Sequence, residues 1–332
     1  MTTYALNGLG RIGKLVLRPL LERGAKIAFI NDVIGDPEMH AHLLQFDSVH
    51  GRWHADFSTE ENSITIDGTR IPVTKESNLQ DLPLDGVDVV IDCTGAFKTE
   101  LKLSPYFSKG VKKVVVSAPV EDGATANIVY GVNENTYDSD THQIITAASC
   151  TTNSLAPVVK VLMEGIGIKH GAFTTIHNVT NTQTIVDRPS RDLRRARSAL
   201  NNLIPTSTGS ANAIMLIYPK LKGKLNGHAV RVPVLNASIT DCVFEMVRET
   251  TVSEVNNLFK AAADGPLKNI LGYETRPLVS SDYMNDTRST IIDGPSTMVV
   301  NETQLKVYAW YDNEYGYAHR LVDVALMVGK KL

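Results

Sequence analysis

A turn that contains Gly8, Gly10 and Gly13 lies between a predicted strand at residues 3–7 and a predicted amphipathic helix that ends at Gly24. A second short apolar strand follows this helix. Strands that are apolar on both faces then recur at helix-length intervals up to about residue 150, which is typical of a parallel sheet covered by helices. The pattern therefore predicts an α/β fold, with a Rossmann-type doubly wound parallel sheet in this part of the chain.

The pattern changes near residue 150. An irregular, Arg-rich stretch covers residues 180–209, and longer runs of alternating apolar and polar residues follow at 228–234, 239–247 and 304–310. Alternation is typical of antiparallel strands with one face against solvent or another subunit. We therefore expect a domain boundary near residue 150 and a second, α+β domain with a mainly antiparallel sheet.

Charge and cysteine content exclude several classes of protein. The 332 residues carry 33 basic and 36 acidic side chains, and the net charge of -3 gives no general attraction to nucleic acid or to an anionic membrane. Three cysteines, an odd number, argue against a disulfide framework, so we expect a cytoplasmic protein. With neither a signal-like segment nor an apolar run of 18 residues, we expect neither export nor a membrane span. His40 and His42 are interpreted as surface residues, and no metal site is expected.

The glycine-rich turn favours a dinucleotide site. Glycines let the backbone approach a pyrophosphate, and the N-terminus of the following helix supplies N–H groups and a positive dipole. Asp32, which closes the second strand 24 positions after Gly8, would bind the ribose hydroxyls. The alternative is a turn that only packs the helix on the strand, with Asp32 as an ordinary turn residue.

Cys150 is the candidate nucleophile. It follows a predicted strand and opens a predicted helix, where the helix dipole is expected to lower the pKa of its thiol. His177 ends the next predicted strand, so two successive strand ends bring together a thiol and a candidate base. Spacing alone leaves the role of His177 open. A buried, inert thiol is the preferred interpretation for Cys93 and Cys242.

The Arg-rich stretch offers guanidinium groups to a phosphate-bearing substrate. Its arginines are Arg188, Arg191, Arg194, Arg195 and Arg197. Arg231 stands alone in a later alternating run. The alternative for Arg188, Arg191 and Arg197 is a solvated or subunit-facing surface. Nucleic-acid binding is disfavoured because no aromatic residues are interleaved with the arginines.

Five segments together are more specific than any one motif. They are residues 7–13, 148–153, 192–197, 207–209 and 310–316. On these segments the chain closely resembles phosphorylating glyceraldehyde-3-phosphate dehydrogenase, in register from about residue 2 to 332. The resemblance implies that Cys150 attacks the aldehyde to give a hemithioacetal while His177 takes the proton. Hydride then passes to NAD, and inorganic phosphate releases the resulting thioester as an acyl phosphate.

The resemblance also implies the binding residues. Thr180 and Arg231 would hold the substrate phosphate, and a second anion site for the attacking phosphate would contain Ser149, Thr151, Arg195, Thr208 and Gly209. The NAD-binding residues would be Asn7, Gly8, Gly10, Arg11, Ile12, Asp32, Ser117 and Asn313. Protonated His177 and the backbone N–H of Cys150 would stabilise the oxyanion. Plain turns remain the alternative for 208–209 and for Asn313.

The same resemblance implies the domains and the assembly. Residues 1–149 would bind NAD, residues 150–315 would form the catalytic domain, and residues 316–332 would form a helix that returns to the NAD-binding domain. The family is tetrameric, with the Arg-rich loop near a neighbour's cofactor, so a homotetramer with no membrane or nucleic-acid partner is expected.

Three positions depart from the family pattern. Ser77 stands where Arg or Lys is common, residues 118–123 lack the usual charged run, and Arg188 replaces a usual Leu or Gly. By the resemblance, this loop position lies close to the adenosine ribose of the adjacent subunit, where an arginine favours the 2′-phosphate of NADP. The charge of Asp32 repels that phosphate, so we expect NAD to be preferred and NADP to be tolerated.

Several alternatives are left open. Erythrose-4-phosphate dehydrogenase is the nearest enzymatic one, and an isozyme that uses arsenate in place of phosphate requires the same residues. A catalytically inactive binding protein with this fold is a third, disfavoured by the presence of Cys150, His177, Arg231 and Asn313. Glycolysis is the expected pathway, although the sequence does not set the direction of the reaction.

Overall fold

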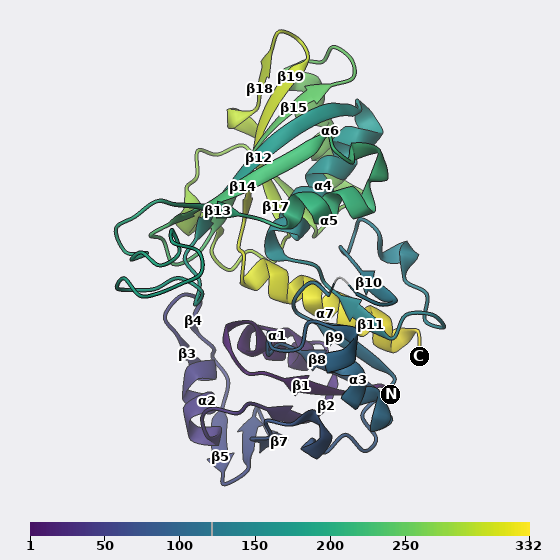
Figure 1. Ribbon diagram of the computed structural model, residues 1–332, viewed down its shortest axis with the longest axis vertical. Coiled ribbons are helices and arrows are strands. Elements are labelled where there is room, and N and C mark those ends of the chain that lie inside the picture. The colour runs from purple at the N-terminus through teal and green to yellow at the C-terminus, as the bar shows by residue number, and fades with distance from the viewer. Residues whose placement is uncertain (121) are drawn as a thin grey trace. The chain divides into compact units, whose positions relative to one another are not determined.

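The computed structural model describes residues 1–120 and 122–332, so Glu121, within the departure at 118–123, lies outside the described residues. Contacts divide the chain into two compact units. Met1–Ser149 and Ala318–Leu332 form the first, and Cys150–Tyr317 the second (Figure 1).

The first unit contains the predicted parallel sheet. Its strands are β1 (Thr3–Asn7), β2 (Lys26–Asn31), β5 (Phe57–Glu60), β6 (Ser63–Ile66), β7 (Thr69–Thr74), β8 (Val89–Asp92), β9 (Lys113–Val116), β10 (Thr125–Asn127) and β11 (Ile144–Thr146). They lie in the order β10-β11-β9-β8-β1-β2-β7-β6-β5. From β7 to β11 this is the 3-2-1-4-5-6 order of a dinucleotide-binding fold, and all neighbouring pairs within it are parallel.

Helices cover this sheet, which explains why its central strands are buried along their whole length. They are α1 (Arg11–Glu22), α2 (Pro37–Gln45) and α3 (Glu100–Ser108). The short strands β3 (Phe46–Asp47) and β4 (Gly51–Arg52) pair with each other. β1, β8 and β9 are buried at every position, as expected for parallel strands with both faces covered. One core cluster joins Val90, Val114, Leu103 and Tyr106.

His40 departs from the expectation of a surface residue. It lies in α2 and is buried. Its Nε2 atom is 3.0 Å from the position that a Cβ atom would take on Gly35, so the loop before the helix closes over the ring.

The last helix, α7 (Tyr315–Lys330), begins in the second unit and belongs to the first from Ala318 onward. Its start is fixed by Asp312, whose Oδ1 atom accepts hydrogen bonds from the backbone N–H groups of Glu314 and Tyr315. At its end, the Thr2 hydroxyl donates to the Gly329 carbonyl at 2.7 Å. The N-terminal and C-terminal segments of the chain therefore meet in the first unit.

The second unit is built on the predicted, mainly antiparallel sheet. Its strands are β12 (Ile168–Asn178), β13 (Ile204–Ser207), β14 (Leu225–Val232), β15 (Ser238–Met246), β16 (Leu271–Glu274), β17 (Thr290–Asp293), β18 (Met298–Val300) and β19 (Gln304–Tyr311). They lie in the order β13-β14-β12-β15-β19-β17-β16, with β18 paired to β19. β12 pairs antiparallel with β15 but parallel with β14.

Helices cover one face of this second sheet. They are α4 (Cys150–Gly165), α5 (Ser210–Ile217) and α6 (Val252–Asp264). α4 packs across β12, β15, β17 and β19 and lies between α5 and α6 (Figure 1). Along β15 every second residue is buried, as the alternating sequence predicts. The predicted α/β class and both predicted sheets are confirmed. Within the described residues no helix combines the length and the apolar character that crossing a bilayer requires.

Candidate active site

The turn that carries Cys150 holds a strained residue. β11 ends at Thr146, and Ala148 then takes a left-handed backbone conformation with φ of 52°. This conformation costs a non-glycine residue roughly 1–2 kcal/mol, and such strain concentrates at functional sites. The Thr146 hydroxyl accepts a hydrogen bond from the Ala148 N–H at 3.2 Å, which stabilises the turn. Cys150 thereby becomes the first residue of α4, at the positive end of the helix, and the residue as a whole is half-buried.

His177 lies directly against this thiol. The His177 Nε2 atom is 3.6 Å from the Cys150 Sγ atom. The ring is 4 % exposed, its Nδ1 atom lies 2.8 Å from the Asn178 carbonyl oxygen, and Tyr311 packs against it edge-on. The structure therefore brings together the two residues that the sequence identifies as nucleophile and base.

Burial decides the charge of this pair. Burial raises the pKa of the Cys150 thiol, and it outweighs the opposite effects of Arg231 and of the hydrogen bonds from Thr151. Burial and the Arg231 charge lower the pKa of His177 to about 3. The expected lowering of the Cys150 pKa by the helix dipole is therefore wrong for the resting site. Both shifts favour the neutral forms, a thiol beside an uncharged imidazole, over a thiolate–imidazolium pair.

Arg231 reaches the other side of the imidazole. β14 runs parallel to β12 with Arg231 opposite His177, and the guanidinium Nη1 atom is 2.6 Å from His177 Nδ1 and 3.0 Å from the Asn178 carbonyl oxygen. A guanidinium only donates hydrogen bonds. When it donates to Nδ1, the ring proton is on Nε2, and that nitrogen then has no lone pair to accept the thiol proton. When Nδ1 donates to the Asn178 carbonyl, the Nε2 lone pair faces sulfur.

The other predicted anion-binding residues lie in the second unit, together with Cys150 and His177. Ser149 is the exception, because it is the last residue of the segment Met1–Ser149 of the first unit. The Arg195 Nε atom donates to the Thr206 hydroxyl at 2.9 Å, and the Thr180 hydroxyl donates to the Gln183 side-chain oxygen at 3.1 Å. Gly209 precedes α5, is exposed, and has open space where a Cβ atom would project. The Thr208 hydroxyl donates a hydrogen bond to the Ser210 hydroxyl at 3.2 Å.

The Thr151 hydroxyl is already engaged. It lies 2.9 Å from the Tyr311 hydroxyl, which also lies 2.7 Å from the Thr175 hydroxyl. Tyr311 is 1 % exposed, so this chain of hydroxyl groups is internal. The backbone N–H of Thr151, in the first turn of α4, is a further donor that this residue can offer to an anion site.

In the first unit, the turn after β1 tests whether the residues fit a dinucleotide. Gly8 has a φ of 93°, and a Cβ atom there would lie 2.6 Å from the Thr94 nitrogen. A Cβ atom on Gly13 would overlap the Gly8 carbonyl oxygen, so both positions need glycine for the protein's own packing. A Cβ atom on Gly10 would meet nothing within 4 Å, and no side chain caps α1. This open approach to a helix N-terminus is what a bound pyrophosphate requires, so the residues fit the cofactor.

The remaining predicted cofactor residues surround this turn. The carboxylate of Asp32 accepts hydrogen bonds from the Leu9 N–H at 2.7 Å and the Ile34 N–H at 3.0 Å, which orient it beside the glycine-rich turn. Arg11 pairs with Asp47 at 2.5 Å. Ile12 and Ser117 are half-buried.

The buried Asn7 side chain has internal partners. It donates to the Tyr106 hydroxyl at 2.6 Å and accepts from Asn31 at 2.8 Å. Tyr106 in turn donates to Asp92 at 2.8 Å. Asn7 therefore stabilises the start of the turn through a hydrogen-bond network that joins the ends of β1, β2 and β8.

Both parts of the chain match one family. Residues 2–100 match the model of the glyceraldehyde 3-phosphate dehydrogenase NAD binding domain, and residues 149–313 match that of the C-terminal domain. The chain belongs to the glyceraldehyde-3-phosphate dehydrogenase family. It is 57 % identical to glyceraldehyde-3-phosphate dehydrogenase 3 of a Nostoc species, over 98 % of each chain. It is 49 % identical to glyceraldehyde-3-phosphate dehydrogenase 1 of Bacillus cereus, over 100 % of this chain and 99 % of the relative. An enzyme of Geobacillus stearothermophilus with the family name is 47 % identical over 98 % of each chain.

Within this dehydrogenase fold, sequence reasoning missed several residues around the reactive pair. Tyr311, Thr175 and Ser238 are buried beside it on β19, β12 and β15. Tyr311 stands two positions before Asn313 in a motif that the sequence does highlight. Nothing in the local pattern marks Ser238.

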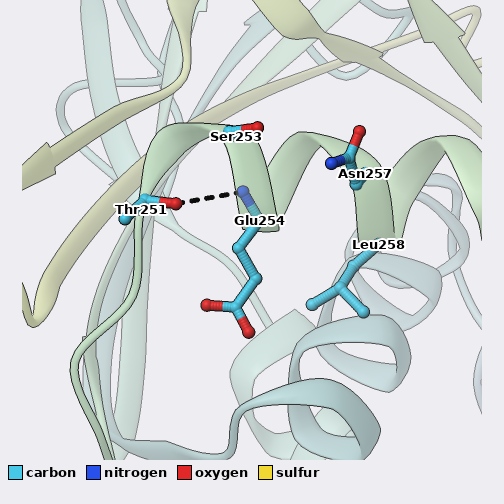
Figure 2. Close-up of a pocket in the computed structure, with 5 residues that line it drawn as sticks. All are labelled: Thr251, Ser253, Glu254, Asn257 and Leu258. Atoms are coloured by element: carbon cyan, nitrogen blue, oxygen red, sulfur yellow. Dashed lines mark hydrogen bonds between the residues drawn. The ribbon is translucent and has the colours of Figure 1, made fainter.

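A surface pocket of about 480 Å³ beside the start of α6 contains none of the predicted site residues. Figure 2 shows its lining by Thr251, Ser253, Glu254, Asn257 and Leu258. The Thr251 hydroxyl caps the helix by accepting the Glu254 N–H at 3.2 Å. The Glu254 carboxylate already pairs with Arg248, so this pocket offers no reactive group.

Proposed function

We propose that this protein oxidises D-glyceraldehyde 3-phosphate and phosphorylates the product to 1,3-bisphosphoglycerate, with reduction of NAD. Membership of the family supports the reaction class. The contact between Cys150 and His177, with Arg231 on the far side of the imidazole, is the observation that carries the mechanism.

Substrate phosphate is expected to prepare the base. In the resting site, the Arg231 Nη1 atom contacts both His177 Nδ1 and the Asn178 carbonyl oxygen, and these two atoms also contact each other. A phosphate dianion attracts the guanidinium and, with Thr180, holds it away from the ring. The Nδ1–H group then donates to the Asn178 carbonyl, the Nε2 lone pair faces the thiol, and the pKa of His177 rises because a positive charge has moved away.

Cys150 then attacks the aldehyde carbon. The sulfur–carbon bond forms, the carbonyl π electrons move to oxygen, and the thiol proton passes to His177 Nε2. The oxyanion is stabilised by the His177 imidazolium and by the Cys150 backbone N–H at the start of α4. His177 delivers the proton to give a neutral hemithioacetal.

Oxidation and phosphorolysis complete the cycle. When bound, NAD supplies the oxidant that takes up the hydride leaving the substrate carbon. His177 removes the hydroxyl proton in this step, and Cys150 is left as a thioester. Inorganic phosphate, held by Ser149, Thr151, Arg195, Thr208 and Gly209, attacks the carbonyl carbon, and the carbon–sulfur bond breaks to release the acyl phosphate. Exclusion of water until phosphate arrives conserves the thioester.

The cofactor residues are assigned by the same proposal. Asn7, Gly8, Gly10, Arg11 and Ile12 build the pyrophosphate-binding turn. Asp32 binds the adenosine ribose, Ser117 lies near the nicotinamide ribose, and Asn313 binds the nicotinamide carboxamide.

We place the enzyme in the cytoplasm as a homotetramer. Three free cysteines support a reducing compartment. The Arg-rich segment also exposes large apolar side chains, which support a role in subunit contact. They are Ile185, Val186, Leu193, Leu200 and Leu203.

The test is a phosphate-dependence assay on purified protein with both aldehydes. We expect NADH formation from D-glyceraldehyde 3-phosphate to require phosphate or arsenate, to exceed that from erythrose 4-phosphate, and to fall at least about 10³-fold in Cys150→Ser. Equal turnover without phosphate, or faster turnover of erythrose 4-phosphate, would contradict the proposal.

A further inference from the structure

One edge of the second unit's sheet collects the reactive groups. β14 and β12 end there, each one residue after Arg231 and His177. β15 begins there with Ser238, and β19 ends there just before Asn313. These strands are neighbours in the order β14-β12-β15-β19. Ser238 therefore lies between the strand of the base and the strand that leads to Asn313.

Ser238 bonds to both of these neighbours. Its Oγ atom accepts a hydrogen bond from the Asn178 backbone N–H at 3.2 Å and donates one to the Asn313 Oδ1 atom at 3.0 Å. Ser238 is 1 % exposed and Asn313 is 4 % exposed, so solvent does not replace these contacts. Asn178, which is fully buried, is held a second time by its side-chain amide, which donates to the Leu235 carbonyl at 2.6 Å.

The hydrogen-bond inventory of one hydroxyl fixes the direction of this chain. A serine hydroxyl has one hydrogen to donate. A buried O–H group needs an acceptor, and Asn313 supplies it with Oδ1. The Asn313 Nδ2 group is consequently turned away from Ser238 and is the end of the carboxamide available to a ligand carbonyl.

The same hydroxyl supports the base. It anchors the N–H of Asn178, and the carbonyl of Asn178 is the acceptor for His177 Nδ1 at 2.8 Å. That carbonyl selects the tautomer in which Nε2 accepts the thiol proton. A displaced Asn178 would leave the imidazole to Arg231, which selects the other tautomer.

We propose that Ser238 is a positioning residue that orients the Asn313 carboxamide for the nicotinamide and holds the Asn178 peptide for His177. This inference rests on the proposed role of Asn313. Ser238 touches neither substrate nor cofactor and acts through these two neighbours.

The test compares Ser238→Ala with Ser154→Ala and Ser238→Thr in the full-length protein. Ser154 is fully buried in α4, and its hydroxyl donates to Thr290 at 3.2 Å, so its loss removes a similar buried hydrogen bond. NAD affinity is measured by titration calorimetry without substrate. The pH dependence of Cys150 alkylation by iodoacetamide is measured without NAD.

We expect Ser238→Ala to bind NAD about fivefold to tenfold more weakly, the effect of one buried hydrogen bond. We also expect its alkylation midpoint to move to lower pH by about half a unit or more, because Arg231 then holds Nδ1 and the His177 Nε2–H group donates a hydrogen bond to the Cys150 thiolate. Ser154→Ala should match the wild type in NAD affinity and in alkylation midpoint. Ser238→Thr keeps the hydroxyl and should therefore be close to the wild type in both quantities.

The proposal requires both changes. A Ser238→Ala protein whose NAD dissociation constant or alkylation midpoint equals that of the wild type overturns it, whatever its thermal stability. The variant Asn313→Ala distinguishes a failure of the role proposed for Ser238 from a failure of the role proposed for Asn313. If it loses NAD affinity while Ser238→Ala does not, only this inference fails. If Asn313→Ala also binds NAD normally, the proposed role of Asn313 fails with it.

Discussion

Glycine serves two purposes in the turn after β1. Gly8 and Gly13 are required by the protein itself, because a Cβ atom at either position would overlap backbone atoms. Gly10 faces open space, so the packing of the chain does not require a glycine there, and we propose that the missing side chain leaves room for the cofactor. The same spacing motif thus combines a packing requirement with a binding requirement, and the two can be separated by mutation.

We expect Gly10→Ala to weaken NAD binding at least about tenfold and to change the free energy of unfolding by no more than ~1 kcal/mol. Gly8→Ala should lower that free energy by ~3 kcal/mol or more, since it adds overlap to an unfavourable φ. Urea denaturation and NAD titration of both variants check this. Destabilisation by Gly10→Ala equal to that by Gly8→Ala would be inconsistent with the distinction.

His177 links the site to acid stability. Burial and Arg231 hold its pKa at about 3, whereas the unfolded chain has a value near 6.5. The unfolded state binds the proton between these values, so the contribution of the neutral ring is complete above about pH 6.5 and is lost as the pH falls toward 3. Between pH 7 and pH 4.5, the free energy of unfolding measured by urea denaturation should fall by at least ~1 kcal/mol less in His177→Gln than in the wild type. Parallel losses would contradict this assignment.

At the scale of elements, the first unit depends on a close contact between its last helix and its first strand. The helix α7 approaches β1 so closely that a Cβ atom on Gly329 would lie 2.0 Å from the Tyr4 hydroxyl oxygen. Tyr4 is 4 % exposed and has little room to move.

We therefore expect Gly329→Ala to lower the free energy of unfolding by ~1–3 kcal/mol, despite the better helix propensity of alanine. Tyr4→Phe removes the overlapping oxygen. The double variant should recover part of the loss, a coupling that denaturation of all four proteins measures. Strict additivity would show that this contact does not limit the approach of the helix.

Local pattern predicts the elements better than it predicts their neighbours. The strand, the glycine-rich turn and the helix at the start of the chain follow from periodicity, as does the position of Cys150 at a helix start. The contact of Arg231 with His177 depends on the parallel pairing of β14 with β12, and residues 54 positions apart carry no local sign of it. The pKa of Cys150 was predicted in the wrong direction because the helix dipole is local, whereas burial depends on the packed unit.

At the scale of the whole molecule, we expect cofactor preference to depend on Asp32 and on Arg188 of an adjacent subunit. Asp32 lies in the first unit and the exposed Arg188 in the second. A carboxylate that binds ribose hydroxyls repels a 2′-phosphate, and an arginine attracts it.

We expect kcat/KM to be higher with NAD than with NADP. Asp32→Ala should raise the NADP to NAD ratio at least about tenfold, and Arg188→Leu should lower the use of NADP without affecting that of NAD. Initial rates with both cofactors decide this. A wild-type preference for NADP would show that attraction by Arg188 outweighs repulsion by Asp32, contrary to this prediction.

The two ends of the chain share the first unit, and this arrangement sets an order for biosynthesis. Residues 1–149 leave the ribosome early, but α7, whose buried face includes Leu321, Ala325 and Val328, is translated last. The contiguous unit Cys150–Tyr317 is therefore synthesised before the residues that complete the first unit. A stop codon near the end of the gene is expected to damage the part of the protein that was made first.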